Sequence, residues 1–513
     1  MTSDGLRVWL GRHGQMGSQL AMAACLLGLI AWTCWESPKY PQRTRFGDDV
    51  EYLLGAQSFV RHGTPDFRPG DDQAALAQLP RKWRGSAALK YQPPRPSGYF
   101  EARNGRLYSW HFWTYPAAVA PFTAVLEPYG LGARAFHYAN VLYLCAALLT
   151  LAQLATRPRL WLTLLPLAFF TPVLWFLPLV HTEPFVFSLG LVSLACAMSE
   201  RRVLAILFSS LAATQFQPLA LISLYLCAES LWLYRGRYAL MAACLACAAL
   251  AFVPNVFYSW HFGTPSVVTR EGYANSGLIS FEKLASMFVD LDTGLLVYLP
   301  GVLLLWTLSL GSAAWRALQA RSLGPLLLAA SVVLALYIST SARIWNYHTQ
   351  GISRYALYTV PALLLVIARE LEALPRLRWP FAAAFAVALG LQALVHAEWG
   401  WFEYRGNNNL HHNRVALFVL ERWPALYNPP PEIFCSRTVE RRCWIDLDSG
   451  RVTDEYLPAI LSDAADTPLK ALVQPCKPEA TLAARAWTPE QTAQIRAAAA
   501  SCGSGAPRYL NFR

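Results

Sequence analysis

Two adjacent carboxylates, Asp48 and Asp49, are the residues whose types and spacing best suit catalysis. They begin the segment Gly47-Asp-Asp-Val-Glu-Tyr-Leu-Leu-Gly-Ala-Gln-Ser-Phe-Val-Arg-His-Gly63, in which apolar residues recur at helical spacing. One carboxylate of such a pair can accept the proton of an attacking hydroxyl group. Acidic residues are also common at the starts of helices, so a purely structural role stays open.

The composition indicates that membrane helices must position these acids. Hydrophobic residues make up 55% of the 513 residues and charged residues only 15%, whereas soluble domains carry about 25% charged residues. Apolar runs recur at about 20 residues, the length that crosses a hydrocarbon core of about 30 Å. Lipid offers the backbone no hydrogen-bond partners, so we expect these runs to be helices.

The net charge is +11, and its distribution along the chain predicts how the protein is oriented in the membrane rather than a nucleic-acid partner. The basic residues lie in short loops between apolar runs, and such loops face the cytoplasm. The run at 17–35 lacks a cleavage site before Glu36, so we expect a retained first span and a cytoplasmic N-terminus. A secretory signal peptide is the alternative.

These rules predict an all-α polytopic membrane protein of the bacterial inner-membrane type, with about eleven transmembrane helices. The stretch 36–135 is an external loop, in which 112–126 is an interfacial helix rather than a span. The membrane domain is 1–397. The predicted spans are 17–35, 136–155, 160–180, 184–199, 202–215, 217–234, 239–258, 293–311, 323–341, 355–368 and 379–397.

Residues 398–513 are polar and Pro-rich and predict a small extracytoplasmic domain of α+β type. Its four cysteines can pair outside the cytoplasm, and spacing favours Cys435–Cys443 and Cys476–Cys502 among three possible pairings. A zinc site is the alternative, although CxxC spacing is missing. We expect His411-His412 to lie in a solvated loop.

The segment at Asp48 resembles the first external loop of GT-C glycosyltransferases, the class that contains protein O-mannosyltransferases and the lipid A aminoarabinose transferase. The resemblance extends to about residue 397 and does not include the C-terminal domain. Four further motifs appear in the same order: Tyr108-Ser-Trp-His-Phe-Trp-Thr-Tyr-Pro, His181-Thr-Glu-Pro-Phe, Asp292-Thr-Gly-Leu-Leu-Val-Tyr-Leu-Pro and Ser353-Arg-Tyr-Ala-Leu-Tyr-Thr-Val-Pro.

This resemblance implies an inverting transfer of a sugar from a polyprenyl-phosphate donor to an extracytoplasmic acceptor, which could be a glycolipid, a protein or an envelope polymer. By the resemblance, Asp48 is the general base, and Asp49 positions the acceptor or a metal. Because both are aspartates, their roles are exchangeable. The sequence establishes no cofactor and leaves a divalent cation open.

The leaving phosphate needs fixed positive charge. Arg354, beside Tyr355 at the external end of a span, is the first candidate, and Arg343 and His348 in the same loop are second choices. An arginine at this depth can also snorkel to the membrane surface.

Tyr52 and His111 are candidates for contacts with the sugar. His111 lies among tryptophans and also fits an interfacial aromatic belt. His181 and Glu183, at an external span end, fit either a helix cap or a site.

A transporter or flippase of lipid-linked or polar substrates is the rival interpretation. Transporters place acids and broken helices near the midplane, whereas the acids here concentrate in the first external loop. The sequence has no Walker loop, which argues against an ATP-driven pump. An O-antigen ligase or polymerase would place its catalytic residues in a late loop. The enzyme interpretation is therefore favoured.

Overall fold

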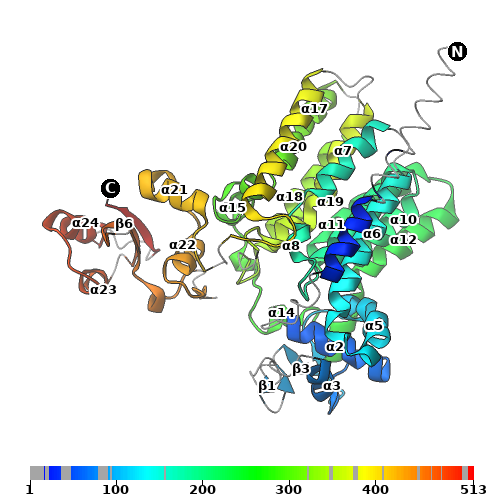
Figure 1. The fold of residues 1–513 in the computed structure, drawn as a ribbon, viewed down its shortest axis with the longest axis horizontal. Coiled ribbons are helices and arrows are strands. Elements are labelled where there is room, and N and C mark those ends of the chain that lie inside the picture. The colour runs from blue at the N-terminus through cyan, green and yellow to red at the C-terminus, as the bar shows by residue number, and fades with distance from the viewer. Residues whose placement is uncertain are drawn as a thin grey trace. The chain divides into compact units, whose positions relative to one another are not determined.

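The computed structural model is mostly helical (Figure 1). It describes residues 17, 22, 24–35, 48–78, 91–92, 95–96, 98–154, 158–319, 323–345, 350–373, 379–406, 410–446, 451–463, 465–474, 477–499 and 506–512. The chain forms two compact units. Unit 1 contains 1–270, 301–335 and 357–393, and unit 2 contains 271–300, 336–356 and 394–513. The two units are described separately below.

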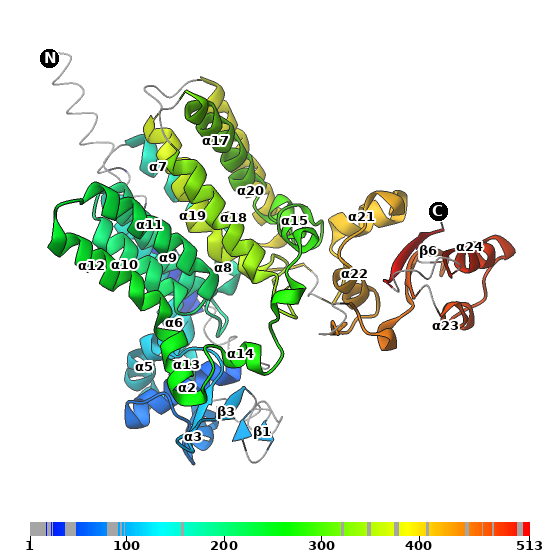
Figure 2. The same ribbon diagram turned by 180° about the vertical axis from the view of Figure 1, so that it is seen from behind.

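Unit 1 begins with a helix over 24–35 and continues with helices that lie side by side (Figure 2). Helix α9 packs against both α6 and α10, and α2 packs against α5. The helices are α2 (Asp48–His62), α3 (Asp71–Gln78), α5 (Thr114–Leu126), α6 (Ala135–Leu154), α7 (Pro158–Phe169), α8 (Val173–Phe176), α9 (Glu183–Met198), α10 (Arg202–Ala213), α11 (Ala220–Leu233), α12 (Tyr238–Ala249), α13 (Val253–Phe262) and α14 (Val267–Arg270).

Four long helices contribute residues to both units: α17 (Pro300–Leu318), α18 (Gly324–Ser339), α19 (Arg354–Ala373) and α20 (Trp379–Trp399). Unit 1 also holds two short antiparallel pairs, β1 (Tyr91–Gln92) with β2 (Arg95–Pro96) and β3 (Tyr99–Glu101) with β4 (Leu107–Ser109).

Unit 2 combines helices with one antiparallel sheet, whose strand order is β5-β6-β7. The strands are β5 (Ala459–Ser462), β6 (Pro468–Val473) and β7 (Arg508–Asn511), and β6 is buried along its whole length. The helices are α15 (Phe281–Val289), α16 (Leu295–Tyr298), α21 (Arg414–Arg422), α22 (Pro431–Thr438), α23 (Pro478–Ala483) and α24 (Pro489–Ala499).

Four of the described helices are long and apolar enough to cross a membrane: Ala135–Leu154, Tyr238–Phe262, Pro300–Leu318 and Pro380–Trp399. Shorter apolar helices occupy most of the other predicted spans. The count of eleven spans stays a prediction. The predicted interfacial segment 112–126 is indeed helical, as α5.

Two predicted spans are wrong in extent. The span at 160–180 is not one helix, because α7 ends at Phe169 and only the single turn of α8 follows. Pro172 lacks the N–H that a continuing helix would need. The span at 293–311 is also displaced: α16 ends at Tyr298, the next residue, Leu299, has a non-helical φ of −137°, and the long helix starts at Pro300. Proline is favoured at such a first position.

Within unit 2, a buried carboxylate network replaces the solvated loop predicted around His412. Asp292 is 2% exposed and His412 is 3% exposed. The Nδ1 atom of His412 lies 2.8 Å from Asp292 Oδ2, and the backbone N–H of Asn413 donates to Asp292 Oδ1 at 2.8 Å. The guanidinium of Arg437 approaches the same carboxylate at 3.7 Å. The histidine is therefore a core residue.

Asp290 belongs to the same network. Its Oδ1 accepts the backbone N–H groups of Asp292 and Thr293, and its Oδ2 accepts the hydroxyl of Tyr427 at 2.9 Å. Burial and the neighbouring Asp292 raise the pKa of Asp290 to about 6. Burial opposes ionisation of Asp292 too, but His412 and Arg437 hold its pKa below the ordinary value.

The disulfide Cys435–Cys443 is confirmed, with Cα atoms 5.9 Å apart. It joins α22 to the segment that follows this helix, and both cysteines lie in the core of unit 2. Cys476 and Cys502 lie outside the described residues, so their pairing stays a prediction.

The two aspartates provide a matched test. The raised pKa of Asp290 stabilises unit 2 below about pH 4, and this contribution is lost as the pH rises through about 6. Asp290→Asn keeps the acceptor oxygen, so its stability relative to wild type should rise across this range. Hydrogen exchange of peptides from residues 410–446 at about pH 5 and about pH 7 measures the difference.

Asp292→Asn should lose stability relative to wild type as the pH rises. It leaves Arg437 buried without its carboxylate, which should destabilise unit 2 by about 3–5 kcal/mol. The lowered pKa of Asp292 contributes stability above its ordinary value, and this is lost as the pH falls through the folded pKa. Equal exchange rates for the two variants would contradict this account.

Candidate functional site

The first turn of α2 carries three acids: Asp48, Asp49 and Glu51. Negative charge is favourable here because helix N-termini carry partial positive charge. Residues three apart share a helix face, so Asp48 and Glu51 point to one side and Asp49 to another. Asp48 is half-buried, while Asp49 and Glu51 are 5% and 3% exposed.

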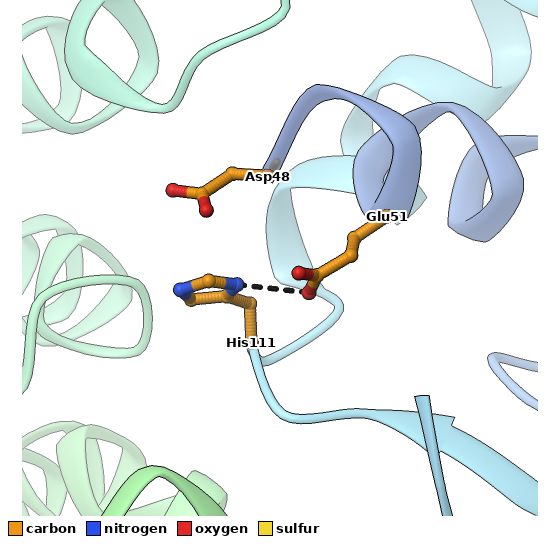
Figure 3. Close-up of side chains that lie close together, drawn as sticks. All are labelled: Asp48, Glu51 and His111. Carbon is orange, nitrogen blue, oxygen red and sulfur yellow. Dashed lines mark hydrogen bonds and ion pairs between the residues drawn. The ribbon is translucent and has the colours of Figure 1, made fainter. Parts of the chain in front are cut away.

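Glu51 is held by three consecutive residues of the chain. Ser109 Oγ donates to Oε2 at 2.6 Å, Trp110 Nε1 donates to Oε1 at 2.8 Å, and His111 Nδ1 lies 2.9 Å from Oε2. Figure 3 shows His111 next to Glu51, with the carboxylate of Asp48 also directed toward the imidazole ring. The hydroxyl of Tyr99 donates to the backbone carbonyl of Glu51 at 3.1 Å.

Gly98 allows the backbone to pass close to the side chain of Glu51. Its φ is +79°, and a Cβ atom added there would lie 2.1 Å from Oε1 of Glu51. Glycine is the residue that tolerates both conditions. Its carbonyl accepts the N–H of Trp110 at 3.0 Å. The β3–β4 hairpin then places residues 109–111 against the first turn of α2.

The surroundings of Glu51 disfavour the ionised form of its carboxyl group. Burial raises its pKa above the ordinary value, His111 opposes the shift, and the charge of Asp48 adds to it. A buried carboxylate beside a second carboxylate is an arrangement that a positive partner stabilises.

Asp48, Glu51 and His111 could hold a metal ion. Each offers one ligand atom, and these atoms lie within 4.8 Å of one another. One imidazole and two carboxylates suit zinc or another transition metal better than calcium. The fit is partial, because Glu51 already accepts three side-chain hydrogen bonds. A cation bound through Glu51 would have to displace at least one of them.

Asp49 faces a second histidine. His181 Nε2 lies 3.2 Å from Asp49 Oδ1, and His181 Nδ1 lies 3.9 Å from Glu183 Oε2. Glu183 is the first residue of α9 and is 1% exposed. The first turn of α2 is therefore flanked by one histidine on each of two faces. These contacts fit both a site and helix packing, so both interpretations of His181 stay open.

The other predicted residues fall into different settings. Tyr52 is 3% exposed, and its ring centroid lies 5.5 Å from Tyr115 and 5.7 Å from His111. Its side chain is therefore packed in the core beside the site. His111, at 29% exposure, remains accessible.

Of the predicted phosphate ligands, Arg354 begins α19 and is half-buried, and Tyr355 follows it. Arg343 packs within unit 2, where its Nε donates to the carbonyl of Ile445 at 2.6 Å and its guanidinium lies over Trp444. His348 lies outside the described residues. The pairing of Arg354 with Asp48 stays a prediction.

Sequence reasoning missed Glu51. A signal was available, since Glu51 lies three residues after Asp48 and therefore on the same helix face. Nothing local indicated that Ser109, Trp110 and His111 would all donate to it.

Comparison of the chain with protein family models, with curated proteins and with solved structures finds no match. The resemblance to GT-C glycosyltransferases therefore rests on the short motifs quoted above. What the site can do must be argued from its own side chains.

Glu51→Gln should loosen the hairpin segment that holds His111. An amide has one acceptor oxygen in place of two, so at least one of the three donors loses its partner, at a cost of about 1–3 kcal/mol. Hydrogen exchange in peptides from 98–113 should become faster. Glu101→Gln, at an exposed position on β3, is the control. Unchanged exchange in the Glu51 variant would show that the hydrogen bonds to Glu51 do not order this segment.

Proposed function

We propose that this chain is a membrane glycosyltransferase of the GT-C type, which transfers a sugar from a polyprenyl-phosphate donor to an extracytoplasmic acceptor. The observation that carries the proposal is the acidic first turn of α2, flanked by His111 and His181, in a chain with four helices able to cross a membrane. The motifs that resemble this class include both histidines.

In this proposal Asp48 accepts the proton of the acceptor hydroxyl as its oxygen attacks the anomeric carbon. The bond from that carbon to the phosphate oxygen breaks, and the polyprenyl phosphate leaves with inversion. Asp48 suits the role best because it is the most exposed acid of the first turn, whereas Asp49 and Glu51 are buried against histidines. Asp49 would orient the acceptor through His181.

The proposal places the chain in the bacterial inner membrane, with a cytoplasmic N-terminus and an extracytoplasmic domain at 398–513. The disulfide Cys435–Cys443 supports this orientation, because disulfides persist outside the reducing cytoplasm. Arg354 and Tyr355, with His348 as a second choice, would bind the leaving phosphate.

A transporter or flippase is the second candidate, and one observation favours it. The apolar stretch from α7 to α8 is interrupted near Pro172 and buried, and discontinuous helices line the substrate sites of many transporters. Against it, the four candidate spans contain a single carboxylate, Glu398, in the last turn of α20. Three acids lie instead in the first turn of α2, and Glu229 of the shorter apolar helix Gln217–Leu233 is paired with Arg202 and Arg369.

Asp48→Asn should reduce sugar transfer by at least about a hundredfold while membrane insertion is unchanged, because it removes the base at almost constant volume. Mass analysis of envelope glycans in a deletion strain that carries each variant provides the readout. Loss of transfer in Asp49→Asn alone would exchange the roles of the two acids. Wild-type transfer in both variants would refute the enzymatic proposal.

Removal of divalent cations by chelation distinguishes between Asp48 as the general base and Asp48 as a cation ligand. If Asp48 is the base, transfer in purified membranes should survive an excess of EDTA. Loss of transfer that added Mn²⁺ restores would instead show that a cation takes part, with Asp48, Glu51 and His111 as its candidate ligands.

Arg354→Lys should keep partial transfer and Arg354→Ala very little, because lysine retains the charge but not the planar fork that grips two phosphate oxygens. The loss should appear in the use of the donor. Arg343→Lys is the matched control, since Arg343 packs against Trp444. Normal transfer in both Arg354 variants would assign a snorkelling role to this arginine.

A further inference from the structure

Helix α15 in unit 2 presents an apolar stripe outward. Phe281 and Val289 are 73% and 55% exposed, and Ala285 between them is also exposed. These residues recur every four positions and so lie on one helix face. The opposite face is buried and includes Leu284 and Met287. A helix with its outer face in water would normally carry polar residues at these outward positions.

Helix α21 and the turn after it show the same feature. Val415 and Phe418 are 39% and 48% exposed, while Ala416 and Leu420 fill the core. Trp423 and Leu426, in the turn that follows, are 52% and 76% exposed. Four large apolar side chains therefore lie on the outer surface of a segment of thirteen residues, Arg414 to Leu426.

Helices α15 and α21 each contact the C-terminal end of an apolar helix. Arg414, at the start of α21, forms an ion pair of 2.9 Å with Glu398 in the last turn of α20. The ring of Phe281 stacks on Tyr337 near the end of α18, with centroids 4.5 Å apart. Helix α20 is long and apolar enough to cross a membrane, and α18 is one of the shorter apolar helices.

The two apolar faces belong to one assembly within unit 2. Asn413 caps α21 by accepting the N–H of Ala416 at 2.9 Å, and its amide donates to the carbonyl of Leu291 at 2.6 Å. Leu291 lies two residues after the end of α15, so a single hydrogen-bonded junction links both helices. The buried pair of Asp292 and His412 reinforces the same junction.

Two arginines lie beside the apolar face of α21, together with the exposed Glu421 and with Glu398, which pairs with Arg414. Arg414 and Arg422 flank its apolar face, and the guanidinium of Arg422 lies 3.9 Å from the ring centroid of Phe418. Amphipathic helices with aromatic and aliphatic residues on one face and arginines beside it are typical of membrane interfaces.

We propose that α15 and α21 lie in the headgroup layer of the bilayer, in the leaflet where α18 and α20 end. Lipid is the partner that covers Phe281, Val289, Val415 and Phe418. The inference rests on the membrane placement proposed above and is independent of sugar transfer. Unit 2 is thereby held at the depth of lipid phosphates, which is where a polyprenyl-phosphate donor presents its own phosphate.

Photo-cross-linking of the full chain tests the proposal. The photoreactive analogue p-benzoylphenylalanine replaces Phe281 or Phe418, a mild change at an exposed aromatic position. The protein is reconstituted in nanodiscs of phosphatidylethanolamine and phosphatidylglycerol, and adducts are identified by peptide mass. Phospholipid adducts at both positions should exceed those at the exposed control Glu490 by about tenfold.

Val387, 53% exposed on α20, is the second control. Lipid adducts at Val387 with none at Phe281 and Phe418 would overturn this inference and leave the membrane placement intact. Absence of adducts at Val387 as well would overturn both. Adducts from Phe418 to a second copy of the chain, or to another protein, would also overturn it, because a protein and not lipid would then cover this face.

Discussion

The carboxylate of Glu51 is the group on which the candidate site depends. A buried carboxylate is costly unless hydrogen bonds and opposite charge compensate it. Ser109, Trp110 and His111 supply that compensation from three successive positions. The same bonds fix the imidazole of His111 beside Asp48, so the stability of the β3–β4 region and the geometry of the site have one origin.

A similar arrangement recurs on the other face of the same helix turn, where Asp49 meets His181. Two acids of one helix start are thus directed to different histidines, which come from different parts of unit 1. The division gives adjacent aspartates distinct surroundings, with Asp48 accessible and Asp49 buried. This difference is what allows separate roles to be proposed for residues of identical type.

Buried carboxylates with distant hydrogen-bond partners also organise unit 2. Asp290 and Asp292 fasten the loop after α15 to the start of α21 through His412, Asn413 and Tyr427. The hydrophobic core of unit 2 forms around this junction and includes Cys435 and Cys443. Two amphipathic helices are held by the same junction, and their apolar faces stay outward.

The sequence by itself indicated that the chain is mostly helical and apolar, that the acid pair starts a helix, and that Cys435 can reach Cys443. These features depend on residues close together in the chain, which periodicity and spacing report. Tertiary structure alone decided the partner of Glu51, 60 residues away, and that of Asp292, 120 residues away. It also decided that the stretch from 160 to 180 is interrupted and that His412 is buried. Hydrogen-bond partners at such separations are chosen by how helices and loops pack, and no local pattern of residues encodes that choice.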